Sequence, residues 1–229
     1  MATRKVINGN EIELIAFDFD GTLIDSTTAI VESIQSAAAD IGVPVPSDER
    51  ASHIIGLGLF EALRRAVPDL PHERYQELTD RYRHHYFARD SQLRLFVGVE
   101  AMLDELAGAG YLLTVATGKS RAGLDRALAA TGLGRRFLSS RCADECHSKP
   151  HPQMLQELMD EFGISPEATL VIGDTTHDLQ MAKNAGAHAV AVTYGAHPRD
   201  SLEAEHPAFC ANNVEELMNW FNYGSDKTL

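Results

Sequence analysis

The sequence predicts an α/β fold in which a parallel sheet is flanked by helices and an all-helical cap is inserted after the first strand. Two observations lead to this prediction. Short apolar runs alternate with helical patterns through most of the chain, an order typical of a parallel sheet covered on both faces. Residues 26–94 break this order, because they contain no convincing strand pattern and their apolar residues recur with helical spacing.

Four segments are expected to form buried strands, since each is a short apolar run bounded by turn residues. They span residues 13–18, 111–116, 169–173 and 188–193. Helices are expected around them at about 99–109, 120–131, 151–162 and 177–185. A glycine follows each of these helical patterns, at Gly110, Gly132, Gly163 and Gly186. Glycine is favoured there because many helices end with a residue in the left-handed conformation.

The insert is expected to be helical at about 27–41, 48–66 and 72–89. An insert that leaves the first strand at its carboxyl end lies over the edge where open α/β sheets bind ligands. The predicted domains are therefore a catalytic core of residues 1–25 and 95–229 and a helical cap of residues 26–94.

The composition narrows the classes of partner. A chain of 229 residues fits one large domain or a domain with a smaller insert. Its formal charge of −13 argues against a nucleic acid, whose binders need a positive face. No apolar run reaches the roughly 18 residues of a membrane helix, no secretory signal is expected, and three cysteines suit a reduced cytoplasmic protein. A monomer and a homodimer are both compatible with the sequence.

Two aspartates follow the first expected strand, in the stretch Asp18-Phe19-Asp20-Gly21-Thr22. Residues two apart in a strand point the same way, so the carboxylates of Asp18 and Asp20 are expected to converge. Carboxylates forced together repel, and either one pKa rises or a cation binds between them. Taken alone, this signal leaves a pair of solvated loop aspartates as an equal alternative.

A hydroxyl and a glycine follow the second expected strand, in Thr117-Gly118-Lys119-Ser120. A hydroxyl and a glycine N–H at a helix N-terminus form a natural phosphate site. The last three residues resemble the end of a nucleotide-binding P-loop, but that motif requires a glycine where this chain has Leu113.

Two further stretches add a lysine and two acids. Lys149 precedes Pro150 at the expected start of a helix, and a cation among several carboxylates can anchor a phosphate. Asp174 and Asp178 follow the expected strand 169–173, and carboxylate oxygens are ligands that Mg²⁺ prefers. All four stretches are expected at carboxyl ends of strands, hence on one rim of the sheet, where they would form a metal-assisted phosphoryl-transfer site.

With these motifs in this order, the sequence resembles the haloacid dehalogenase superfamily, with a Rossmann-like core, over about residues 13–221. The position of the insert resembles the subgroup with a helical cap. Asp18 to Ser26, Ser148-Lys149-Pro150-His151-Pro152 and Gly173-Asp174-Thr175 are most similar to phosphoglycolate-phosphatase-like members. The resemblance implies a Mg²⁺-dependent phosphatase that hydrolyses a small phosphate monoester, phosphoglycolate-like or a sugar phosphate, through an aspartyl-phosphate intermediate.

The resemblance also implies a role for each matching residue. Asp18 is expected to attack phosphorus, and Asp20 to protonate the leaving oxygen and then activate water. Asp18, Asp174 and the backbone carbonyl of Asp20 are expected to hold Mg²⁺, and Asp178 to bind it or to orient Asp174 and a water. The implied phosphate-binding set is Thr117, Gly118, Lys149, Gly21 and Thr22. Thr22 is also expected to fix the loop that carries Asp20.

Three weaker signals lie elsewhere in the chain. Residues 54–59 resemble the specificity loop of the cap. Arg64 and Arg65 could reach a substrate carboxylate, although a solvated helix face is the preferred interpretation. A zinc site is the less favoured interpretation of a cysteine and histidine cluster, because its spacing matches no common zinc pattern. That cluster comprises Cys142, Cys146, His147 and His151.

Other functions stay open at this point. A haloacid dehalogenase is disfavoured, because Asp20 supplies an acid that such enzymes lack at that place. A β-phosphoglucomutase shares both acids and the cap, and an inorganic pyrophosphatase of the same superfamily is a further alternative. Outside enzymes, a phospho-aspartate signalling receiver would leave the insert unexplained. An idle binding module would not need the complete set of motif residues.

Overall fold

The sheet at the centre of the fold has six parallel strands in the order β10-β9-β8-β3-β6-β7. The computed structural model describes residues 4–89 and 93–222. Four of the strands are those expected from the sequence, and no bound differs by more than one residue: β3 (Leu14–Phe17), β6 (Leu112–Thr117), β8 (Thr169–Gly173) and β9 (His188–Val192). The predicted parallel sheet is therefore confirmed.

Two strands of this sheet were not predicted from the sequence. They are β7 (Ser139–Cys142) and β10 (Phe209–Ala211), which occupy its two edges. An edge strand needs no continuous apolar run, because only one neighbour covers its backbone. Accordingly β7 has the polar sequence Ser-Ser-Arg-Cys, and β10 is three residues long. A short antiparallel hairpin near the N-terminus was also missed: β1 (Val6–Ile7) and β2 (Asn10–Glu11).

Helices cover both faces of the sheet, and β3 shows how the sequence directs them. Ile15 and Phe17 pack with α5 (Val99–Gly108), α6 (Arg121–Thr131) and α10 (Val214–Asn222). Leu14 and Ala16 point the other way, toward α7 (Gln153–Phe162) and α8 (Thr176–Ala185). Alternate residues of a strand face opposite sides, so a strand that is apolar throughout requires helices on both.

The helix ends follow the expected glycines. Gly110, Gly132, Gly163 and Gly186 all have positive φ, between 68° and 88°. A short helix, α9 (Arg199–Glu203), and two 3₁₀ turns, Leu133–Arg135 and Pro166–Ala168, complete the core. No helix in the described part of the chain is long and apolar enough to span a membrane.

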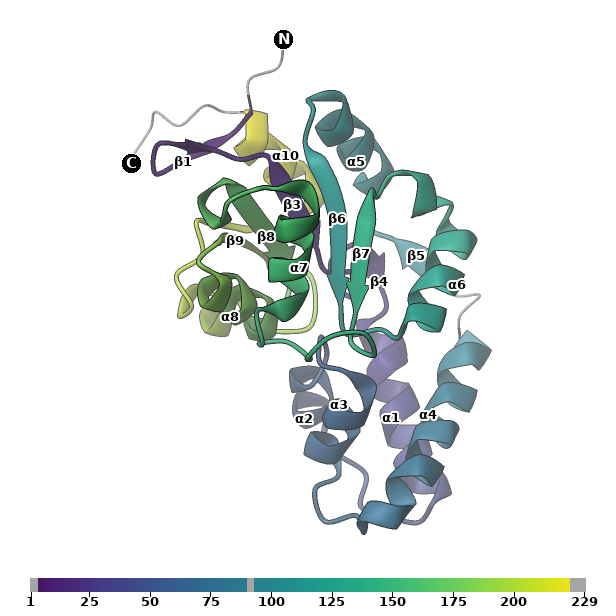
Figure 1. Ribbon diagram of the computed structural model, residues 1–229. Coiled ribbons are helices and arrows are strands. Elements are labelled where there is room, and N and C mark those ends of the chain that lie inside the picture. Colours follow the sequence, from purple (N-terminus) through teal and green to yellow (C-terminus); the bar gives the residue numbers. More distant parts are fainter. Residues whose placement is uncertain (1–3, 90–92, 223–229) are drawn as a thin grey trace.

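The helical insert lies at one end of the sheet, away from the β1–β2 hairpin (Figure 1). It comprises α1 (Thr27–Asp40), α2 (Asp48–His53), α3 (Leu59–Ala66), a 3₁₀ turn (His72–Arg74) and α4 (Tyr75–Arg89). These elements have an apolar core of their own, which includes Ile34, Leu63 and Leu78. The chain enters and leaves the insert through an antiparallel pair, β4 (Ile24–Asp25) and β5 (Arg94–Leu95). The exact domain boundaries at 25/26 and 94/95 stay predictions.

One expectation for the insert is wrong. The sequence predicted a continuous helix over residues 48–66, whereas the structure has two helices separated by residues 54–58. Gly56 has a φ of 91°, which an α-helix does not accommodate, and Gly58 is the N-cap of α3 with extended backbone. The interruption forms the loop that faces the sheet.

Candidate active site

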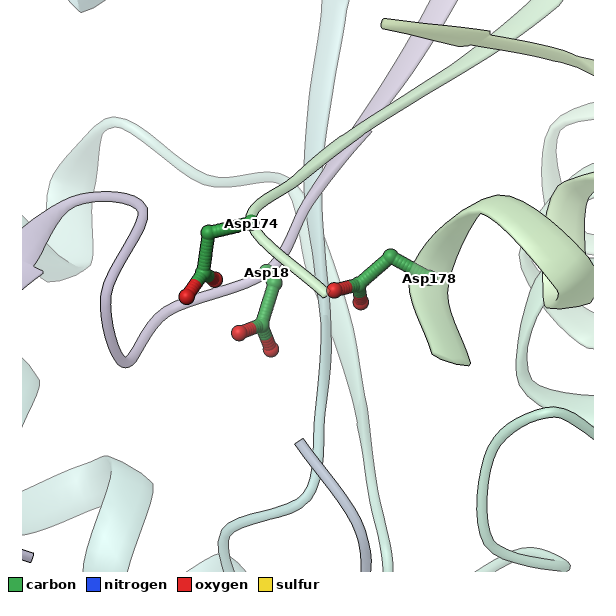
Figure 2. Close-up of side chains that lie close together, drawn as sticks. All are labelled: Asp18, Asp174 and Asp178. Carbon is green, nitrogen blue, oxygen red and sulfur yellow. The ribbon is translucent and has the colours of Figure 1, made fainter. Parts of the chain in front are cut away.

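The predicted acids do come together on one rim of the sheet. Asp18 follows β3 directly, Thr117 is the last residue of β6, and Asp174 follows β8. Because β3 lies between β6 and β8 and all three are parallel, these residues share one edge. In Figure 2 the carboxylate of Asp18 lies between those of Asp174 and Asp178, and oxygens of all three lie within 4.8 Å of one another.

Lys149 is buried between two of these acids. Its Nζ donates hydrogen bonds of 2.6 Å to Asp18 Oδ1 and 2.6 Å to Asp178 Oδ1. Burial would lower the pKa of Lys149, but Asp178 and Asp18 outweigh it and raise that pKa, so the lysine is charged. Contrary to expectation, Lys149 does not follow a strand directly: it belongs to the loop between β7 and α7.

Asp18 lies in an environment that opposes its ionisation. Burial is the main cause, and it raises the pKa of Asp18 to about 7 against the opposing effect of Lys149. One oxygen of this side chain, Oδ2, is buried and has no hydrogen-bond partner. A buried carboxylate oxygen without a partner is costly and is a natural position for a cation or for a reacting atom.

Asp174 is held by a hydroxyl and by a backbone amide. Thr22 Oγ1 donates to Asp174 Oδ1 at 2.8 Å, and the N–H of Ala196 donates to Oδ2 at 2.7 Å. A Cβ on Gly21 or on Gly195 would lie 2.2 Å from Asp174 Oδ2, so both glycines leave the room that this carboxylate occupies. Thr22 and Gly21, expected among the phosphate-binding residues, here shape the position of Asp174.

Asp178 uses both of its oxygens within the protein. Oδ1 accepts from Lys149, and Oδ2 accepts from the N–H of Thr175 at 3.1 Å and from its hydroxyl at 2.6 Å. The contact with Thr175 is the capping box that begins α8. These bonds hold Lys149 and the start of α8, while the two roles that the resemblance implied for Asp178, binding the metal or orienting Asp174 and a water, stay predictions.

Asp20 is held by contacts that sequence reasoning missed. Lys119 Nζ lies 2.8 Å from Asp20 Oδ2, and Ser26 Oγ donates to Oδ1 at 2.7 Å. Lys119 also donates to the hydroxyl of Tyr86, in α4, at 3.0 Å. Burial opposes charge on Lys119, but Asp20 outweighs it and raises the pKa of this lysine, so the lysine is charged. The one sequence feature that could have indicated the contact with Lys119 was the position of this lysine, two residues beyond Thr117.

Thr117 and Gly118, which are expected to bind phosphate, lie beneath the insert. The N–H of Lys119 donates to Thr117 Oγ1 at 3.2 Å, and Ser120 caps α6. A Cβ on Gly118 would lie 2.5 Å from the carbonyl oxygens of Gly56 and Leu57. Glycine at position 118 therefore lets the loop of the insert approach the rim of the sheet closely.

The acids fit a divalent cation. Asp18, Asp174 and Asp178 bring three buried carboxylates to one place, and Lys149 balances only part of their charge. Burial, followed by Asp18 and Asp178, raises the pKa of Asp174 well above its usual range. Oxygen donors of this kind, with the unpartnered Oδ2 of Asp18 among them, suit a hard ion such as Mg²⁺.

The sequence pattern of haloacid dehalogenase-like hydrolases matches residues 15–192, which include every motif residue of this site. The chain belongs to the haloacid dehalogenase-like hydrolase family. It is 36% identical over 211 residues to the probable phosphatase IndB of Dickeya dadantii, covering 90% of this chain and 91% of IndB. It is 31% identical over 217 residues to the phosphoglycolate phosphatase of Aliivibrio fischeri, covering 91% and 96%.

A solved structure supports the same assignment. The structure described as a predicted phosphoglycolate phosphatase from Haemophilus somnus superposes with a TM-score of 0.82 at 27% identity, covering 91% of this chain and 97% of that one. The resemblance to phosphoglycolate-phosphatase-like members of the superfamily is thereby confirmed, as is the prediction that this member is a phosphatase.

Three histidines join the insert to the core of this hydrolase, and sequence reasoning assigned none of them. Nε2 of His177 and Nε2 of His197 donate to the same carbonyl oxygen, that of His53 at the end of α2, at 2.9 and 3.1 Å. The rings of His53 and His197 stack at 4.9 Å. Burial lowers the pKa of His177 and lowers that of His197 to about 4, so both are neutral at pH 7.

Residues 54–59 approach the site, whereas the other two weaker signals of the sequence lie outside it. Arg65 pairs with Glu61 at 2.5 Å on an exposed helix face, and Arg64 lies 6.0 Å from the ring centroid of Phe60. In residues 4–89 and 93–222, the three aspartates are the one group of acids, histidines or cysteines close enough to share an ion. Cys146 Sγ instead lies 3.6 Å from Glu157, and burial raises the pKa of Cys142 to about 12.

A cavity of about 520 Å³ connects the rim of the sheet to the insert. Its core end is lined by Asp18, Asp20, Thr117, Gly118 and Lys119. Its other walls come from α1, residues 54–62, α4, the first half of α6 and the loop after β7. Asp18 and Asp20 thus face a partly open cavity between the rim of the sheet and the insert.

Proposed function

We propose that this family member is a Mg²⁺-dependent phosphatase that hydrolyses a small phosphate monoester through an aspartyl-phosphate at Asp18. One observation carries the proposal. Asp18 Oδ2 is buried and unpartnered at the floor of the cavity, while Lys149 fixes the other oxygen of the same carboxylate. An oxygen that is oriented but unpartnered is what a nucleophilic carboxylate requires.

In the proposed mechanism, the carboxylate of Asp18 attacks phosphorus and the bond from phosphorus to the leaving oxygen breaks. Asp20, held by Ser26 and Lys119, enters the cycle protonated and gives this proton to the leaving oxygen, which leaves it as a carboxylate. Asp20 then takes a proton from the water that attacks the phosphorus of the aspartyl-phosphate, which releases inorganic phosphate and restores Asp18. Asp20 lies beside the cavity and can serve both steps.

Charge at the transferring group is offset by neighbouring residues. Lys149 remains bonded to Asp18 and lowers the cost of bringing an anion to an anion. Thr117 and the N–H of Gly118 are proposed to donate to the phosphate oxygens. A bound Mg²⁺, held by Asp18, Asp174 and the backbone carbonyl of Asp20, would supply further positive charge and keep Asp18 ionised. Asp178 and Thr22 would hold Lys149 and Asp174 in place.

We further propose that residues 26–94 act as a cap over residues 1–25 and 95–229. The insert supplies much of the cavity wall, and its loop contacts Gly118. A cap of this kind excludes water and selects the leaving group. The phosphoglycolate phosphatase among the relatives supports a small phosphorylated molecule as substrate, and a phosphoglycolate-like ester or a sugar phosphate stays the prediction of the sequence. A cytoplasmic location and a monomeric or homodimeric state stay predictions.

Phosphate release from a panel of esters, with and without Mg²⁺, tests the proposal. The panel includes 2-phosphoglycolate, sugar phosphates, nucleotides and pyrophosphate. We expect turnover that requires Mg²⁺ and disappears in Asp18→Asn, whereas Asp160→Asn, an exposed aspartate of α7, leaves it unchanged. Turnover retained in Asp18→Asn would contradict the mechanism. Transfer of phosphate between sugar hydroxyls without release would indicate the mutase instead.

A further inference from the structure

The part of the cavity beyond the acids differs in character from the rim of the sheet. Buried aliphatic side chains of α1 and of the loop after α2 line it: Ile30, Ile34, Ile54, Ile55 and Leu57. Each of these residues is at most 7% exposed. This wall offers no polar side chain to a leaving group that enters past Asp20.

A strip of aromatic rings from α4 continues this wall. Tyr82 and Tyr86 line the cavity with nearly parallel rings, 5.7 Å apart at 19°. Burial is the main cause that raises the pKa of Tyr82, so its ring is neutral. Phe87 lies further along α4 and Phe60 lies in the first turn of α3, and both line the cavity while remaining about half exposed. Aromatic faces arranged along a cavity favour a flat, apolar partner.

The cations on the cavity wall have partners that limit their use by a carboxylate. Lys119 pairs with Asp20. Arg83 is exposed and lies 3.7 Å from Asp80. The guanidinium of Arg126, also exposed, stacks 3.9 Å from the centroid of Phe87. Among the described lining residues, no other lysine or arginine is present. A leaving group that carries its own carboxylate, as glycolate does, would face isoleucine rather than a buried cation.

We propose that the preferred substrate is a phosphate monoester whose leaving alcohol carries a flat, apolar or aromatic ring. This inference rests on the proposed function, because it assigns the leaving-group end of the same site. A cavity of about 520 Å³ lies within the range of about 300–1,000 Å³ that encloses drug-sized ligands. Glycolate would fill a small fraction of it, whereas an apolar ring would itself leave water and pack against the aliphatic and aromatic walls.

A matched pair of esters isolates this effect. Ethyl phosphate and 2-phenylethyl phosphate have primary alkoxide leaving groups of similar basicity, and they differ by the phenyl ring. We expect kcat/KM for 2-phenylethyl phosphate to exceed that for ethyl phosphate by about 10- to 100-fold, as burial of a ring predicts. It should also exceed the value for 2-phosphoglycolate.

Binding gives a second readout that does not depend on turnover. The non-hydrolysable pair, ethylphosphonate and 2-phenylethylphosphonate, is titrated into the wild-type protein with Mg²⁺ by calorimetry. The phenyl compound is expected to bind at least about 10-fold more tightly. If 2-phosphoglycolate or ethyl phosphate is turned over but the phenyl compounds gain nothing in either assay, the inference is wrong and the proposed function stands. Tight binding of the phenyl compound without turnover of any ester would support the apolar leaving-group end and contradict the proposed function.

Variants locate the effect in the cavity. Tyr82→Ala is expected to reduce the ratio of kcat/KM for 2-phenylethyl phosphate to kcat/KM for ethyl phosphate about 10-fold. Because Tyr82 also packs within the insert, Phe87→Ala provides a second variant at a ring that is 45% exposed. Leu138→Ala, at a side chain that is 59% exposed and not part of the cavity, is the control and should leave the ratio unchanged. An unchanged ratio in both cavity variants would overturn the assignment.

Discussion

At the core end of the cavity, charged side chains are buried and almost every polar atom has a partner. At the insert end, the wall consists of isoleucine, leucine and aromatic side chains with few polar atoms. The core end depends on hydrogen bonds that fix individual oxygens, as Thr22 and Ala196 fix Asp174. Binding at the insert end depends on the shape of the ligand and on the apolar area that it buries. A change at the core end should therefore affect all substrates equally, and a change at the insert end should alter the choice among them.

Replacing the buried lysine tests the core end and should have the largest effect. Lys149→Met leaves Asp18 and Asp178 without their shared cation, and we expect kcat to fall at least about 10³-fold for every ester. The same loss should destabilise the fold by about 3–5 kcal/mol, because it leaves buried charges uncompensated. Steady-state kinetics and urea unfolding measure the two effects. A fall in kcat for some esters only would contradict the claim that the core end acts on all substrates equally.

Gly21→Ala should have the next largest effect. A Cβ there would lie 2.2 Å from Asp174 Oδ2, and Gly21 has a φ of 77°. We expect Mg²⁺ affinity, measured by calorimetry, to fall about 10- to 100-fold. Gly9→Ala is the matched control, since Gly9 has a φ of 86° but no atom within 4 Å of its Cβ position. Equal losses of affinity in both variants would assign the effect to backbone strain instead.

The contact of His177 and His197 with His53, which joins the core to the insert, should make stability depend on pH. Burial lowers the pKa of His197 to about 4 in the folded protein, below its ordinary value of 6.5. The unfolded chain therefore binds more protons in this interval, so stability is full above pH 6.5 and falls as the pH drops toward 4. Between pH 7.5 and pH 5 we expect a loss of about 2 kcal/mol from this group.

Urea unfolding at the two pH values, in wild type and in His197→Gln, measures this contribution. The variant should show a smaller loss on acidification, since glutamine does not titrate. The other titratable groups contribute to both proteins alike. An identical pH dependence in the two proteins would show that His197 is not responsible.

Arg65→Ala should have the smallest effect. The Arg65–Glu61 pair lies on an exposed helix face, and neither residue's contact reaches the acids of the core. We expect the free energy of unfolding to change by less than about 1 kcal/mol and KM to stay constant for all esters. A rise in KM specific to 2-phosphoglycolate would mean that this arginine binds a substrate carboxylate, and would contradict an apolar leaving-group end.

The rim of the sheet could be predicted because its signals are local in the sequence. Asp18 and Asp174 each follow a buried apolar strand, and parallel strands bring their carboxyl ends together. The edge strands β7 and β10 escaped prediction because they lack that apolar run. The break at Gly56 in the expected helix 48–66 was underestimated, since helical spacing continues on both sides of it.

Contacts between distant residues could not be predicted in this way. The pair Lys119–Asp20 joins residues 99 positions apart. The two histidines that bind the carbonyl of His53 are 124 and 144 positions from it. A sequence pattern reports which face of its own element a side chain occupies. The Lys119–Asp20 contact depends instead on how the loops after β3 and β6 lie beside each other, and the histidine contacts depend on how the insert packs on the core. The same holds for the apolar cavity, whose walls come from several elements.

The most direct test of the central claim is to trap the phosphorylated aspartate. Asp20→Asn should slow both proton-transfer steps, so that protein incubated with Mg²⁺ and a radiolabelled ester and then quenched in acid retains label. Borohydride reduction followed by peptide mass spectrometry should find homoserine in place of Asp18. Label that is absent from the protein, or homoserine found at another aspartate while turnover proceeds, would contradict the assignment of Asp18 as the nucleophile.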